Sequence, residues 1–162
     1  MPPDEALAAI LEHPQPAALV HSFSEEDLNF LIHDIGFDEA VPLIRLASNR
    51  QWEYMLDMEA WRGDQLHYPS VTTWLRLLLD SDPQRLVRWC FAERLEFLEL
   101  YLFRNIELRV REDDQAPSDF GDGFFSDDDT FYVRIVDYPV STPAEEAARK
   151  QRNDMLYRLL RR

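Results

Sequence analysis

Residues 24–36 read SEEDLNFLIHDIG, and this stretch carries a full set of signals for one short helix. Ser24 is placed to accept a hydrogen bond from an unpaired amide of the first turn, and Asp27 lies in reach of the reciprocal bond of a capping box. Apolar residues then recur along one helical face, at Leu28, Leu31, Ile32 and Ile35. Gly36 supplies a left-handed stop. The stretch predicts a helix from Glu25 to Ile35.

Similar signals recur on both sides of this stretch. Residues 4–12 and 16–21 have the pattern of two further short helices. Later N-caps stand before new apolar stripes at Asp38, Ser48, Ser70 and Asp82. A helix of about three turns cannot bury its apolar face alone, so these helices must stack on one another. We therefore expect residues 1–111 to form a helical-repeat domain, mainly α and of armadillo-like or superhelical type.

The pattern changes in the second half of the chain. The segment from Leu95 to Phe103 is apolar on almost every side, which is typical of a buried helix, so we expect it at the centre of the domain. Apolar and charged residues then alternate from Ile106 to Arg111. This alternation fits either the end of a helix or a strand.

Residues 112–142 are expected to form an acidic loop followed by a small β-hairpin near 123–136. Phe131, Val133 and Ile135 alternate as a strand does, and Gly123–Phe125 is the expected partner. Ser141–Glu146 is a strong helix start, so residues 143–162 form a predicted C-terminal helix. This helix reaches the last residue without a C-cap, and we therefore expect it to be the start of a longer region.

The chain has 162 residues and a formal net charge of −14. This charge opposes nucleic-acid phosphates and anionic membrane surfaces, so we expect neither as a partner. The apolar runs are far shorter than the roughly 20 residues of a membrane-spanning helix, and the start lacks a secretory signal pattern. We expect a cytoplasmic protein. Cys90, the only cysteine, lies between Trp89 and Phe91 and is expected to be a buried small hydrophobe.

The stretch SDFGDGFFSDDDTF, residues 118–131, raises the question of metal binding. No frame of this stretch fits the spacing of acids, glycine and glutamate in an EF-hand calcium loop. Three carboxylates remain as candidate ligands for a divalent cation: Asp127, Asp128 and Asp129. The competing interpretation is a solvated turn held open by like charges. The kinase tripeptide Asp119–Gly121 lacks the glycine-rich loop, strand lysine and catalytic loop that accompany it in kinases.

The remaining polar residues form no catalytic pattern. The histidines are scattered, and none shows the spacing of a zinc protease. The serines at helix starts are explained by capping, and none lies in a nucleophile elbow. We therefore expect neither an enzyme nor a bound cofactor.

The aromatic residues are the better candidates for a functional surface. Tryptophans recur about once per predicted helix, as a stacked core requires, at Trp52, Trp61, Trp74 and Trp89. Tyr54, Trp61 and Tyr68 lie near helix ends and are the candidate interaction surface, because tryptophan and tyrosine are favoured where one edge stays in water.

Several segments together resemble a bacterial family of unknown function. They are ALVHSFSEEDLNFLIHDIG, WEYMLDMEAW, DPQRLVRW, and ELYLFRNIELRVREDD followed by DGFFSDDDTFYVRIVD. A weaker likeness, carried by residues 24–47, is to the helical-repeat cytosolic N-terminal domain of MgtE-type magnesium channels and to armadillo-like domains of flagellar motor switch proteins. The sequence thus predicts a non-enzymatic helical scaffold that binds an unknown protein. The alternative is a divalent-cation-responsive regulatory domain that uses the acidic loop.

Overall fold

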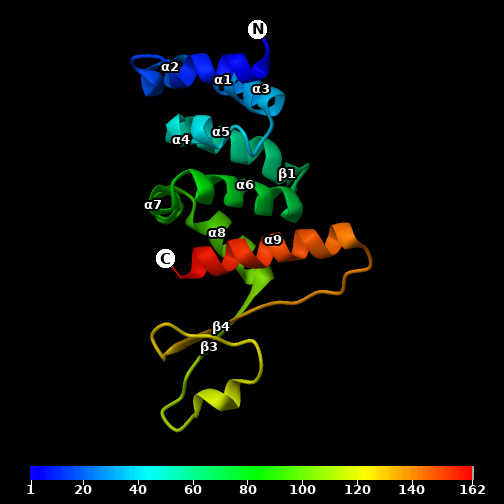
Figure 1. Cartoon of the computed structure of the whole chain (residues 1–162). Coiled ribbons are helices and arrows are strands. Elements are labelled where there is room, and N and C mark those ends of the chain that lie inside the picture. Colours follow the sequence, from blue (N-terminus) through cyan, green and yellow to red (C-terminus); the bar gives the residue numbers. More distant parts are fainter. Residues whose placement is uncertain (162) are drawn as a thin grey trace. The chain divides into compact units, whose positions relative to one another are not determined.

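The computed structural model describes residues 1–161, and the chain divides into two compact units, Met1–Trp89 and Cys90–Arg162. Helices dominate both units, and two small antiparallel sheets make up the regular β structure of the described residues (Figure 1). The predicted mainly α fold, with stacked short helices, a small β element and a C-terminal helix, is confirmed.

The first unit is a stack of short helices. Its elements are α1 (Pro3–Leu11), α2 (Pro16–Ser22), α3 (Glu25–Ile35), α4 (Val41–Leu46), α5 (Asn49–Ala60), β1 (Trp61–Arg62), β2 (Gln65–Leu66) and α6 (Tyr68–Ser81). Helix α3 packs on α1, α5 packs on α3, and α6 packs on α4 and α5, in the successive layers that Figure 1 shows. The boundary between the two units falls within α7 (Pro83–Glu93).

Local capping fixes several of these helices where the sequence predicts them. Ser24 Oγ accepts from the Asp27 amide at 3.1 Å, and Ser48 forms a full capping box with Gln51. The expected N-cap at Asp38 is wrong, because residues 37–40 form a turn and α4 begins at Val41. Helix α6 begins at Tyr68, two residues before the predicted cap Ser70, since Pro69 fits the first turn of a helix.

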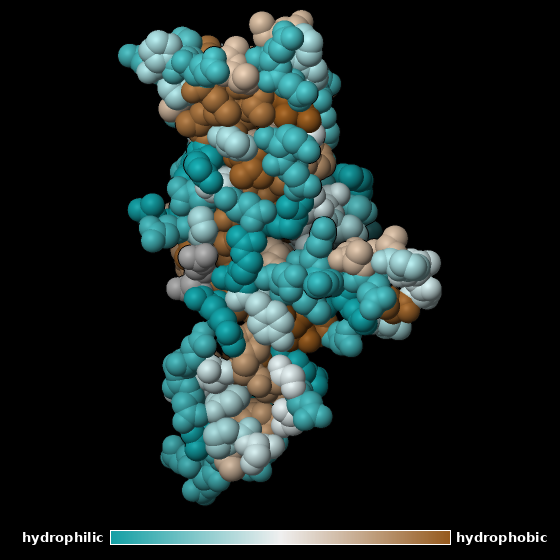
Figure 2. All heavy atoms as spheres, viewed as in Figure 1, coloured by the Kyte–Doolittle hydropathy of each residue, from teal (hydrophilic) through white to brown (hydrophobic). Residues whose placement is uncertain are grey.

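Aromatic side chains from successive helices form the core of the first unit. Trp52 and Trp74 are fully buried, and Trp52 meets Trp89 edge to face at 5.7 Å between ring centroids. All four tryptophans belong to this unit. Figure 2 shows the apolar residues of the first unit (brown) lying between teal helix surfaces.

The second unit combines two helices with a β ribbon. Its elements after α7 are α8 (Leu95–Asn105), β3 (Ile106–Val110), the 3-10 helix η1 (Pro117–Phe120), β4 (Phe131–Ile135) and α9 (Pro143–Leu160). Strands β3 and β4 pair antiparallel, with Leu108 opposite Val133, so the strand interpretation of this segment is right. The expected pairing of Gly123–Phe125 is reduced to a single bridge between Phe125 and Val133.

Across residues 1–161, none of the helices combines the length and the hydropathy that crossing a membrane requires.

Candidate protein-docking surface

Helix α8 has one buried face and one apolar face that nothing in the second unit covers. Phe97, Leu98 and Tyr101 are buried. On the other side, Leu100 is 46% exposed and Phe103 is 88% exposed. The expectation that this helix is buried on all sides is therefore wrong, because apolar residues all round a helix do not by themselves bring a second covering layer.

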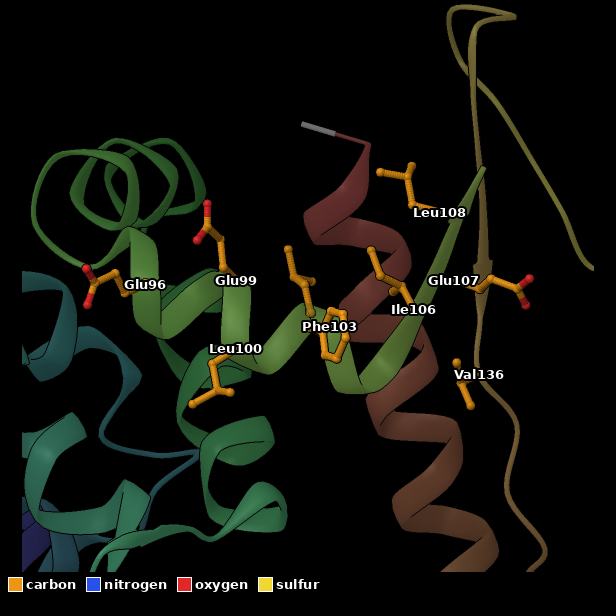
Figure 3. Close-up of a pocket in the computed structure, with 9 residues that line it drawn as sticks. Glu96, Glu99, Leu100, Phe103, Ile106, Glu107, Leu108 and Val136 are labelled. Carbon is orange, nitrogen blue, oxygen red and sulfur yellow. The ribbon is translucent and has the colours of Figure 1, made fainter. Parts of the chain in front are cut away.

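The uncovered face of α8 borders a groove of about 990 Å³. Figure 3 shows how the groove is built: Leu100 and Phe103 come from α8, whereas Ile106 and Leu108 come from β3. Leu102 and Val136 complete the wall together with Glu96 and Glu99, and Glu107 borders it although its carboxylate points to the other face of β3. The groove is thus apolar along its length, with carboxylates beside it. Exposed apolar surface of this kind, rimmed by polar groups, is typical of a protein-binding site.

A buried arginine donates hydrogen bonds at the junction between α8 and β3. Arg152 of α9 is 7% exposed, and its guanidinium donates to the Val136 carbonyl at 2.6 Å and to Asn105 Oδ1 at 3.3 Å. Asn105 Nδ2 in turn donates to the Tyr101 carbonyl at 2.7 Å. Burial lowers the pKa of Arg152, but an arginine keeps its charge in proteins. The groove is therefore built on a fixed helix-to-strand junction.

Charged residues line the opposite face of the ribbon. Glu107 accepts from Arg109, with an ion-pair distance of 2.6 Å, and from Arg134 on β4. Hydrogen bonds from Arg109 and then Arg134 lower the pKa of Glu107 below its ordinary value. In Figure 3, Glu107 points away from the side of β3 that carries Ile106 and Leu108. One face of the strand is thus charged and the other apolar.

The carboxylates of the acidic loop bind groups of the protein itself. Asp128 Oδ1 accepts from the amides of Thr130 and Phe131, each at 2.9 Å, and these bonds lower the pKa of Asp128. Asp129 accepts from the Tyr132 hydroxyl and forms an ion pair with Arg111, and its pKa is likewise lowered. These contacts close the turn that leads into β4.

The acidic loop does not form a recognisable metal-binding cluster among the described residues. Within the described part of the chain, there is no group of three His, Cys, Asp or Glu side chains that could hold a metal ion. Of the three candidate ligands, Asp127 is exposed, whereas Asp128 and Asp129 serve the turn. The metal interpretation stays a prediction, and the hydrogen bonds of the loop have a structural explanation.

A second cavity lies in the first unit between α5 and α6. It measures about 160 Å³ and is lined in part by Glu59, Ser70 and Trp74. His67 Nδ1 and Ser70 Oγ are 2.8 Å apart beside it. Small-molecule sites have volumes of roughly 300–1,000 Å³, so this cavity is too small to serve as one.

The aromatic surface predicted from the sequence lies in the first unit. Trp61 follows α5 directly and is 39% exposed, while Tyr54 within α5 and Tyr68 at the start of α6 are half-buried. These residues do not line the groove of the second unit, and their role stays a prediction. The sequence signal for the groove is the excess of apolar residues on α8, a pattern that buried helices share.

The fold and the surface together define a mainly helical protein with an uncovered apolar groove. A family model described as Family of unknown function (DUF6178) matches residues 1–162, so the chain belongs to this family. This confirms the resemblance to an uncharacterised family, while the weaker likeness to the magnesium-channel domain stays a prediction. No curated protein and no solved structure matches the chain.

Proposed function

We propose that this protein is a non-enzymatic interaction module and that the groove between α8 and β3 is where another polypeptide docks. The observation that carries the proposal is the side chain of Phe103, which is 88% exposed beside the apolar residues Leu100 and Leu108. Large aromatic side chains contribute most of the binding energy at protein interfaces when they become buried there. An exposed phenylalanine in an apolar groove is suited to that role.

The titratable groups with shifted pKa values support the same class of function. Catalytic groups usually combine a shifted pKa with a position in a cleft. Here Asp128 and Asp129 close a turn, and Glu107 binds two arginines of its own ribbon. Cys90 is buried, and burial raises its pKa to about 11, so it is a protonated thiol at neutral pH. Each of these shifts has a structural cause.

Photo-crosslinking in the native cell tests the proposal. Phe103 is replaced by a photoreactive benzoylphenylalanine, and the matched control carries the same replacement at Phe30 of α3, which is 62% exposed. A covalent adduct with a polypeptide is expected on irradiation at position 103 and not at position 30. Equal labelling at both positions, or no adduct at position 103, would overturn the proposal.

A further inference from the structure

The outer edge of β3 has free backbone groups. The Val136 amide donates to the Asn105 carbonyl at 2.9 Å, and the Arg111 amide donates to the Thr130 carbonyl at 2.8 Å. Backbone bonds alternate along an antiparallel strand, so the odd-numbered residues of β3 face β4 and the even-numbered residues face outward. Among residues 1–161, β3 pairs with β4 alone.

The even-numbered residues of β3 therefore offer donors and acceptors to an added strand. Leu108 and Val110 each present an amide and a carbonyl, and Ile106 presents a carbonyl. The Ile106 amide is already bonded to the Leu102 carbonyl as the C-cap of α8. An unpaired edge of this kind is a template for pairing with another chain. Ile106 and Leu108, whose outward backbone groups belong to this edge, also line the groove on the apolar face of β3.

The sequence of β3 is complementary to itself. It reads Ile-Glu-Leu-Arg-Val, an alternation of apolar residues with one acid and one base. When two such strands run antiparallel with Leu108 opposite Leu108, each Glu107 faces an Arg109 and each Ile106 faces a Val110. Shifting the centre to residue 107 or 109 instead places Glu107 opposite Glu107 or Arg109 opposite Arg109. The register centred on Arg109 also sets Glu107 opposite Arg111, but it includes the like-charge pair of Arg109 with Arg109. The register centred on Leu108 sets opposite charges face to face without a like-charge pair.

We propose that the occupant of this surface is a second copy of the chain, bound by antiparallel pairing of β3 with β3. The inference rests on the proposed function of the groove as a docking surface and names its partner. In this register the Leu108 amide of each copy donates to the Leu108 carbonyl of the other. The Val110 amide of each copy donates to the Ile106 carbonyl of the other. These bonds use both backbone groups of Leu108, the Val110 amide and the Ile106 carbonyl. The Val110 carbonyl faces the Ile106 amide that is already bonded to Leu102 and gains no strand partner.

The pairing of two β3 strands would bury apolar side chains on one face and form ion pairs on the other. Leu108 and Val110, which are 56% and 57% exposed, are brought against Leu108 and Ile106 of the other copy on the apolar face of β3. On the charged face, Glu107 of one copy meets Arg109 of the other and extends the existing network with Arg134. The two-stranded ribbon becomes a four-stranded sheet with two-fold symmetry, the commonest symmetry of homodimers.

Charge-reversal variants of β3 test whether two copies pair in the register centred on Leu108. The oligomeric state is measured by sedimentation and light scattering over a range of concentrations, with a dimer expected for the unaltered chain. Arg109→Glu is expected to raise the dissociation constant of the dimer by about tenfold or more, because two opposite-charge pairs become like-charge pairs. Glu107→Arg is expected to do the same. An equimolar mixture of the two variants restores dimers, because all four facing charges are then complementary.

Two further variants show whether a loss of the dimer comes from the β3 pairing itself or from a change in net charge or folding. Arg88→Glu makes the same charge change at an exposed position of α7 and is expected to leave dimerisation unchanged. Leu108→Pro removes an outward-facing amide together with the leucine side chain of the groove, and it is expected to abolish the dimer. An edge strand tolerates proline at such a position. Circular dichroism and melting of each variant show whether the fold is kept.

The outcomes distinguish this inference from the proposed function. A chain that stays monomeric at its highest soluble concentration overturns the self-pairing, and so does a dimer that both Arg109→Glu and Leu108→Pro leave intact. In the crosslinking experiment at position 103, an adduct between two copies of this chain supports both proposals. An adduct with a different protein supports docking but overturns self-pairing, and no adduct overturns docking itself.

Discussion

The guanidinium of Arg85 lies over the indole ring of Trp52, 3.8 Å from the ring centroid. The same side chain donates to the carbonyls of Arg45 and Ala47, at 3.2 and 2.6 Å, and to Asn49 Oδ1. Arg85 thus links the start of α7 to the turn between α4 and α5 through these hydrogen bonds and the contact with Trp52. A lysine cannot reproduce this combination of stacking and branched hydrogen bonding.

Arg85→Lys is therefore expected to lower the free energy of unfolding by about 1–3 kcal/mol, from lost cation–π contact and hydrogen bonds. Arg88→Lys, an exposed position on the same helix, is the matched control and should change it little. Urea denaturation followed by circular dichroism measures both. Equal effects of the two changes would show that the contact with Trp52 contributes no stability.

Arg152→Met tests the junction that shapes the groove. The change leaves the Val136 carbonyl and Asn105 Oδ1 without a buried donor, which is expected to cost about 1–3 kcal/mol. Lys150→Met, at an exposed position of the same helix, is the control. Thermal unfolding compares the two variants, and a Tm of Arg152→Met equal to that of the control would contradict the assigned role.

A phenylalanine-to-serine change is expected to cost much more stability on the buried face of α8 than on its exposed face. Phe97→Ser removes a buried ring and is expected to destabilise the protein by about 3–5 kcal/mol, as truncation of core phenylalanines does. Phe103→Ser changes an exposed ring and is expected to alter stability by no more than about 0.5 kcal/mol. Chemical denaturation distinguishes them. A large loss of stability for Phe103→Ser would mean that this ring is part of the core.

The acidic turn predicts a dependence of stability on pH. The folded-state pKa of Asp129 lies below its ordinary value of 3.8, first because of the hydrogen bond from Tyr132. Its stabilising contribution is therefore present above the unfolded-state pKa and is lost as the pH falls through the folded-state pKa. Asp129→Asn should lower Tm at neutral pH and match the unaltered chain in strong acid. A constant difference in Tm at all pH values would contradict this prediction.

Cys90 is expected to be inert in the folded protein. Burial raises the pKa of its thiol to about 11, and only the thiolate reacts with alkylating reagents. Labelling with iodoacetamide at neutral pH, followed by mass spectrometry, should be slow in native buffer and fast in denaturant. Rapid labelling of the folded chain would show that the thiol is accessible.

The sequence predicts best those elements whose signals are local. Helix α3 begins and ends as expected because Ser24 and Gly36 act within their own turn, and Ser48 and Asp82 work in the same way. The sequence does not distinguish helix from strand at residues 106–111, because no glycine or proline separates α8 from β3. Only pairing with Phe131–Ile135, a contact distant in sequence, selects the strand.

The sequence does not predict the groove, because the groove also depends on contacts between distant segments. Composition shows that Leu100 and Phe103 are apolar, but it does not show whether a neighbouring element covers them. The sequence places both residues in a core because most apolar helix faces are buried. Their exposure is a property of the assembled second unit, in which the helices and the ribbon leave that side of α8 open.

The positions of the tryptophans allow the unfolding of the first unit to be followed separately from that of the whole chain. Since every tryptophan precedes Cys90, emission excited at the red edge of aromatic absorption follows the melting of the first unit alone. Far-ultraviolet circular dichroism follows the helices of both units. A gap between the two melting curves would measure how far the units unfold independently of each other.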